Sequence, residues 1–73
     1  MRRLPQLKGA EVVRAFEKAG WHVRGQRGSH CVLTKEGQFF SLAIPMQDQV
    51  KQGLLHSLIR KADLTVEEFL DLL

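Results

Sequence analysis

The stretch WHVRGQRGSHCVLTK (residues 21–35) decides the fold that this chain is expected to adopt. Apolar and polar side chains alternate along its two arms, as they do in half-buried β-strands, and Gly28 lies at the centre of the turn between them. We therefore predict strands at about Trp21–Gln26 and His30–Lys35, joined as a hairpin. A third strand at about Gln38–Ile44 follows a two-residue turn at Glu36-Gly37, where glycine tolerates positive φ.

Side-chain alternation tests this sheet from two directions, because residues directly opposite each other share a face. If the first hairpin pairs Val23 with Leu33, then Val23, Cys31 and Leu33 share one apolar face. In the second hairpin, Leu33 opposite Phe40 and Cys31 opposite Leu42 give the same face. The helices are expected to cover it over Trp21, Val23, Leu33, Phe40 and Leu42. The other face is expected to stay open and to carry His22, Arg24, Gln26, His30, Val32, Thr34, Phe39 and Ser41.

Helical periodicity flanks the predicted sheet on both sides. Between Lys8 and Ala19 the apolar residues Val12, Val13 and Phe16 recur at helical spacing, and Gly20 follows as the end signal. A second helix at about residues 51–61 is expected to bury Leu54, Leu55, Leu58 and Ile59. A capping box of Thr65 and Glu68 opens a short final helix that is expected to bury Val66, Phe69, Leu70 and Leu73. The predicted class is therefore α+β: a helix, a three-stranded antiparallel sheet, a helix and a short C-terminal helix, with the helices on one face.

Length and composition narrow the class of protein. A chain of 73 residues makes a single domain (residues 1–73) and leaves no room for a separate cofactor domain. Its one cysteine, Cys31, excludes an internal disulfide and favours a reducing compartment. The sequence contains neither a signal peptide nor a run of about 20 apolar residues. We expect a cytoplasmic protein with no membrane partner and no small-molecule cofactor.

The charge is strongly segregated along the chain. Residues 1–35 hold eight Lys or Arg and two acidic residues, a net charge of +6, whereas residues 36–73 hold three and six, a net charge of −3. A basic half of this kind is typical of a surface that binds a polyanion such as a nucleic acid. The cationic residues that could contact phosphates, as a group, are Arg2, Arg3, Lys8, Arg14, Arg24, Arg27 and Lys35.

His30 is the strongest candidate for chemistry. It begins the central strand, on the open face, with Arg24 across the hairpin and Arg27 in the turn. An imidazole can act as acid or base near neutral pH, and adjacent guanidinium groups can stabilise the charge that develops on a phosphate. The alternative from position alone is a surface histidine that closes a hairpin.

The other candidates favour structural readings. His22 lies on the same face but about four residue pairs away, roughly 13 Å, and is too distant to relay a proton to His30. His56 is expected to be a partly exposed helix residue, and Cys31 a small core residue. His30 and Cys31 face opposite ways and carboxylates are sparse near the hairpin, so we predict no metal site. Phe39 could stack on an unpaired base or could be covered by a chain terminus or a partner.

Several motifs occur in an order that resembles the HicA toxin family, small ribonucleases of bacterial and archaeal toxin–antitoxin pairs. They are LPQLKG (residues 4–9), FEKAGW (16–21), RGSH (27–30), IP (44–45), GLL (53–55), IR (59–60) and LTVEEF (64–69). The set spans nearly the whole chain. Two positions depart from the family pattern: Met46-Gln47 stands where members often carry a second histidine, and His56 stands where they often carry arginine.

The resemblance implies an αβββα fold like that of double-stranded-RNA-binding domains. It also implies that the histidine after Gly-Ser, here His30, is the catalytic residue of a metal-independent cleavage of mRNA, and that a HicB-like antitoxin covers the active face. The residues expected to contact RNA are Arg24, Arg27, Gly28, Ser29 and Lys35. Two alternatives on the same fold are a non-catalytic RNA-binding module and an adaptor that binds only protein.

Overall fold

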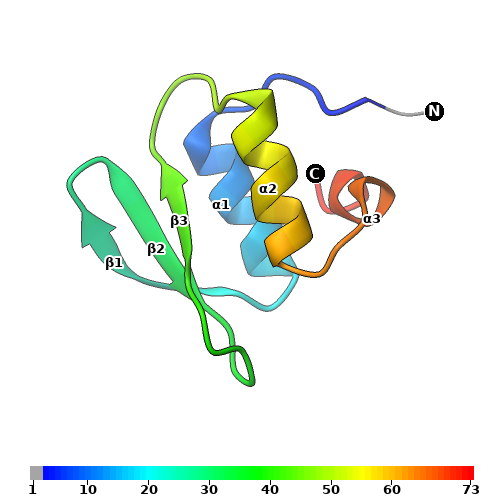
Figure 1. Cartoon of the computed structure of the whole chain (residues 1–73). Helices are drawn as coiled ribbons and strands as arrows, with labels where there is room; N and C mark the ends of the chain where they lie inside the picture. Colours follow the sequence, from blue (N-terminus) through cyan, green and yellow to red (C-terminus); the bar gives the residue numbers. More distant parts are fainter. Residues whose placement is uncertain (1–2) are drawn as a thin grey trace.

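The computed structural model describes residues 3–73, which form three helices and one three-stranded sheet (Figure 1). In chain order they are α1 (Gly9–Lys18), β1 (His22–Arg27), β2 (His30–Thr34), β3 (Leu42–Pro45), α2 (Gln52–Lys61) and α3 (Val66–Leu70). The strands are antiparallel in the order β1-β2-β3, so β2 is central. The predicted α+β fold, an αβββα arrangement with a short C-terminal helix, is confirmed. Within residues 3–73, no helix is long and apolar enough to span a membrane.

The helix α1 begins and ends at the predicted signals. The Glu11 carboxylate accepts a hydrogen bond from the Lys8 N–H at 2.9 Å, which satisfies one donor at the helix start. Gly20 follows the helix with φ of 99°, a left-handed conformation that favours glycine. At the other end, the Gly9 N–H donates to the Gln47 carbonyl at 2.9 Å, and a Cβ atom on Gly9 would collide with the Pro45 carbonyl oxygen. Glycine is therefore what allows α1 to touch the end of β3.

The register of the second hairpin differs from the predicted one by two residues. Cys31 lies opposite Ile44 and Leu33 opposite Leu42, and residues 38–41 belong to a loop. The predicted turn is present, since the Gln38 N–H donates to the Lys35 carbonyl at 3.0 Å. Phe40 leaves the ladder and packs its ring against Trp21 at a centroid distance of 5.9 Å. A shift of two residues preserves alternation, so the assignment of faces in β2 still holds.

The first hairpin contains a β-bulge that the sequence analysis missed. His22 pairs with Thr34 and Val23 with Leu33 as predicted, but the next pair is Gly25 with Val32. Arg24 is the extra residue, and every later residue of β1 changes face. Gln26 therefore lies opposite Cys31, on the core side of the sheet, and its predicted position on the open face was wrong. Its side-chain amide donates to the Gly28 carbonyl at 3.3 Å.

The core lies between the sheet and the helices and includes most of the predicted residues. Side chains from α1, β2, β3, α2 and α3 contribute, and the largest fully buried ones are Trp21, Phe16, Phe69, Leu33, Leu42, Ile44, Leu55 and Ile59. Val23 was expected in the core but is 45% exposed. It belongs to the outermost strand, and Figure 1 shows that the β1–β2 hairpin projects beyond the helices.

Two leucines were also wrongly assigned to the core. Leu54 is 39% exposed because the buried stripe of α2 runs through Leu55, Leu58, Ile59 and Ala62, which leaves Leu54 on the flank of the helix. Leu73 is 47% exposed because α3 ends at Leu70. The predicted capping box of α3 is confirmed: Thr65 Oγ1 accepts from the Glu68 N–H at 3.1 Å, and the Glu68 carboxylate accepts from the Thr65 N–H at 2.9 Å.

Candidate nucleic-acid interface

The open face is the side of the sheet turned away from the helices, and β2 presents His30, Val32 and Thr34 on it. Cys31 and Leu33 are buried on the core side, so the residues between them must point the other way. His30 is exposed and begins β2. Because β2 is the central strand, His30 lies between two strand partners, Arg27 of β1 and Pro45 of β3. The backbone that carries the imidazole is therefore held from both sides.

The turn that precedes His30 is tied to both neighbouring segments. Gly28 has φ of 56°, in the left-handed region where glycine is favoured. On one side its carbonyl accepts from the Gln26 amide. On the other, the Ser29 carbonyl accepts from the Met46 N–H at 2.7 Å, directly after β3. Gly28 and Ser29 thus fix the turn from which His30 extends.

The bulge places a cation directly beside the histidine. Arg27 was predicted in the turn, but it ends β1 opposite His30 and shares the open face with it. Arg24, predicted across the hairpin from His30, is instead the unpaired bulge residue further along β1. The arginine nearest to His30 in the ladder is therefore Arg27, and Arg24 adds a second cation beyond it.

Two shallow hollows follow the open face. The first, which we call the histidine hollow, is lined by Arg27, His30, Val32, Ser41 and Ala43. The second, the arginine hollow, is lined by Arg24, Gly25, Arg27 and Val32, and also by Gln26, which reaches it from the core side at the edge of the sheet. They share Arg27 and Val32, so they form one continuous cationic surface. Among residues 3–73, neither hollow has a carboxylate in its lining, a composition suited to a polyanionic ligand.

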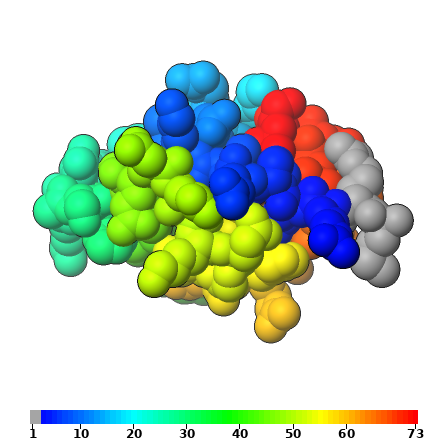
Figure 2. Space-filling view, turned by 90° about the horizontal axis from the view of Figure 1, so that it is seen from above, coloured from blue at the N-terminus to red at the C-terminus, as the bar shows by residue number. Residues whose placement is uncertain are grey.

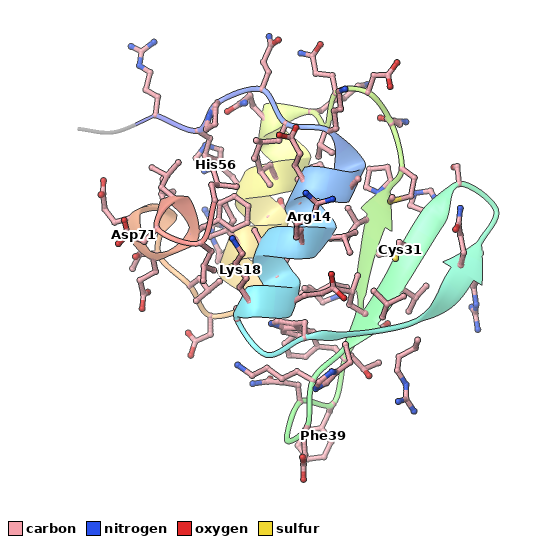
Figure 3. All side chains as sticks on the ribbon, turned by 180° about the vertical axis from the view of Figure 1, so that it is seen from behind. Arg14, Lys18, Cys31, Phe39, His56 and Asp71 are labelled. Atoms are coloured by element: carbon pink, nitrogen blue, oxygen red, sulfur yellow. The ribbon has the colours of Figure 1, made fainter. Side chains whose placement is uncertain are left out.

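The remaining histidines and cysteine lie outside these hollows. His22 pairs with Thr34, four residues along β2 from His30, about 13 Å at ordinary strand rise. His56 is exposed on α2, on the helical side of the molecule (Figure 3). Cys31 is a buried core residue as predicted, and burial, followed by the nearby Glu17 carboxylate, raises the pKa of its thiol. In the described part of the chain, no group of three His, Cys, Asp or Glu side chains could hold a metal ion.

The predicted phosphate-contact residues are only partly brought together. Arg24 and Arg27 lie on the open face, whereas Arg14 is on α1 (Figure 3) and Lys8 precedes that helix. Lys35 lies beyond the far end of β2, beside Gly20, and is separated from His30 by the length of the strand. Arg2 lies outside the described residues. The charge segregation of the sequence thus corresponds to several separate surfaces and not to one patch.

The site includes features that sequence reasoning did not identify. Ala43 lines the histidine hollow beside Ser41, which alone of the two was predicted on the open face, and the bulge brings Arg27 into line with His30. An isolated glycine inside a predicted strand is a known signal of a bulge, and Gly25 is such a residue. Taking Gly25 into account would have corrected the faces of both Gln26 and Arg27.

Together these features define a small α+β protein with a cationic open sheet face and an exposed histidine at the start of its central strand. The sequence model of one protein family, described as HicA toxin of bacterial toxin–antitoxin, matches residues 9–64 of the chain. The chain therefore belongs to the HicA toxin family, and it is the toxin component of a toxin–antitoxin system, which implies an antitoxin partner. A comparison with curated proteins gives no match.

Proposed function

We propose that this toxin is a metal-independent endoribonuclease that cleaves mRNA on the open face, with His30 as the catalytic acid or base. The observation that supports this most directly is the pairing of an exposed His30 with Arg27 at a strand end held from both sides, in a hollow whose lining, among residues 3–73, includes no carboxylate. An RNA phosphate in the histidine hollow would meet a proton acceptor and a guanidinium donor at the same time.

The proposed reaction is an internal transesterification. His30 accepts the proton of a ribose 2′-hydroxyl, the 2′-oxygen forms a bond to the adjacent phosphorus, and the bond from phosphorus to the 5′-oxygen breaks. The Arg27 guanidinium stabilises the negative charge that accumulates on the phosphoryl oxygens. Of residues 3–73, those that line the hollow include no second histidine and no carboxylate, so we assign protonation of the leaving oxygen to solvent water.

A nuclease toxin of this geometry would be inhibited most directly by an antitoxin that covers the open face. Acidic antitoxin residues would satisfy Arg24 and Arg27 and would bury His30. The C-terminal segment lies on the side of the molecule opposite the β1–β2 hairpin, and so do both termini of the described chain (Figures 1 and 2). This segment is acidic and carries Asp63, Glu67, Glu68 and Asp71. Neither RNA nor the antitoxin needs to contact that side.

The chemistry of the RNA ends tests this proposal. The purified toxin, free of antitoxin, is incubated with a defined mRNA in excess EDTA, and the 3′ ends of the fragments are analysed by mass spectrometry. We expect full activity and 2′,3′-cyclic phosphate ends, because the attacking nucleophile is the 2′-hydroxyl. Activity lost on chelation and restored by magnesium, or fragments with 3′-hydroxyl ends, would contradict the mechanism. Binding of intact RNA without cleavage would favour a non-catalytic RNA-binding module, and no interaction with RNA would favour a protein adaptor.

A further inference from the structure

Phe39 is the most exposed large apolar side chain in the described part of the protein. The other exposed large apolar residues retain 38–47% of their accessible surface, whereas Phe39 is fully exposed. It lies at the tip of the β2–β3 loop (residues 35–41) and points away from the body of the molecule (Figure 3). No described residue covers it, so packing within residues 3–73 does not account for an aromatic side chain at this position.

The base of the loop is cationic and well supported. Lys35 extends along Gly20, with its Cε 3.3 Å from where a Cβ atom of Gly20 would lie. The Lys61 Nζ lies 5.3 Å from the ring centroid of Phe40, and that ring packs on the buried Trp21. Two ammonium groups thus flank the root of a loop whose single acidic residue is Glu36. This association of an exposed aromatic ring with neighbouring cations is typical of surfaces that bind single-stranded nucleic acid.

We propose that Phe39 is a stacking platform for an unpaired base of the RNA substrate, with Lys35 and Lys61 beside it contacting the phosphate backbone. The proposal rests on the proposed function, because it concerns RNA bound by this toxin. Lys35 lies about 17 Å along β2 from His30, the length of about five stacked nucleotide steps. One strand could therefore reach both the histidine hollow and the loop.

This contact would select a class of substrate and not a base sequence. A phenyl ring has no hydrogen-bonding group, and every base has a face on which it can stack. A base held in a duplex is stacked on its neighbours and is unavailable. Phe39 therefore favours unpaired RNA, and its contribution should depend on the aromatic character of the side chain and not on its hydrophobicity alone.

The test measures RNA affinity in a His30→Ala background, so that the RNA stays intact. Phe39 is replaced by Ala, Leu and Trp, and Leu54→Ala serves as a matched control that removes another exposed apolar side chain. Each protein is titrated with a single-stranded oligonucleotide and with a set in which one base at a time is removed to leave an abasic site. We expect Phe39→Ala and Phe39→Leu to weaken binding roughly five- to hundredfold, with Phe39→Trp and Leu54→Ala unchanged.

The abasic series supplies the decisive comparison. One abasic position should weaken binding by the Phe39 parent but have no further effect on Phe39→Ala, which would identify the stacked base. In Phe39→Trp, bound RNA should quench the fluorescence of the new indole. The native Trp21 is buried and should contribute little to the change in fluorescence.

Equal RNA affinity of Phe39→Ala and its parent would overturn the inference even if the wild-type protein cleaves RNA. A position-specific loss in a protein that never cleaves would support the inference and reject the proposed enzyme. If Phe39→Ala weakened antitoxin binding and left RNA affinity unchanged, Phe39 would belong to a protein interface and the inference would fail. Absence of RNA binding in every variant would reject both proposals.

Discussion

The two faces of β2 differ sharply in burial. Leu33 and Cys31 are buried against the helices, while His30 and Val32, one residue along the strand, line a hollow open to solvent. The same five-residue strand therefore contributes to stability through one set of residues and to the candidate site through the other. Strand alternation keeps the two roles apart, so substitutions on one face should leave the other largely unaffected.

The outer strands repeat this contrast. All six residues of β1 are exposed, whereas three of the four residues of β3 are buried. The residues of β1 therefore contribute little to the core. This strand can carry two arginines and a bulge without disturbing the packing of the core. The β3 side anchors the sheet to α1, through the close approach of Gly9 to Pro45.

The largest expected effect on stability compares Leu33→Ala with Val32→Ala. Leu33 is fully buried, and its truncation should lower the free energy of unfolding by about 2–5 kcal/mol. Val32 is half-buried on the open face, and its truncation should lower it by about 1 kcal/mol or less. Denaturant unfolding followed by circular dichroism measures both. Equal losses of unfolding free energy would mean that the open face of β2 contributes to stability as much as the core face does.

The contact between α1 and β3 gives the next effect. Gly9→Ala should lower the free energy of unfolding by about 1–3 kcal/mol, because the added methyl group meets the Pro45 backbone. Gly53→Ala in α2 is the matched control. Nothing lies within 4 Å of a Cβ atom there, and alanine should stabilise the helix by up to about 1 kcal/mol. A neutral Gly9→Ala would show that α1 is not held against β3 in the way described.

The smallest effects concern the arginines of the open face. Arg24→Ala and Arg27→Ala should each remove about one phosphate contact, which lowers the slope of log affinity against log salt by about 0.7 for single-stranded RNA. Only Arg27→Ala should also slow cleavage by bound enzyme, because Arg27 lies opposite His30. Arg14→Ala, on α1, is the control and should change neither. An affinity independent of salt would point to a partner other than RNA.

Much of the fold was predictable because its signals are local. The helix ends coincide with Gly20 and with the Thr65–Glu68 capping box, and the alternation around Cys31 and Leu33 identified the buried face. The register of the second hairpin was not predictable in the same way. A register error of two residues leaves every side chain on its face, so the hydrophobic pattern alone could not detect it.

The arrangement of the site depended on geometry that composition does not encode. The bulge at Arg24 exchanged Gln26 for Arg27 on the open face, and Gly25 was its only local sign. Val23 is exposed because the helices do not cover the sheet as far as this residue. The periodicity of the β1 sequence carries no information on the extent of that cover. His30 was identified correctly as an open-face residue because it belongs to β2, and the bulge lies in β1. Alternation along β2 is therefore undisturbed.

The cleavage rate of His30→Ala, measured beside His22→Ala, tests the central claim most directly. Both histidines are exposed and at opposite ends of the β1–β2 hairpin, so each substitution should leave the circular dichroism spectrum and the free energy of unfolding unchanged. In single-turnover cleavage of a defined mRNA, we predict a loss of about 10²–10⁴-fold for His30→Ala and a rate near that of the wild type for His22→Ala. Cleavage at the wild-type rate by folded His30→Ala, or equal losses in both variants, would contradict the assignment of His30 as the catalytic residue.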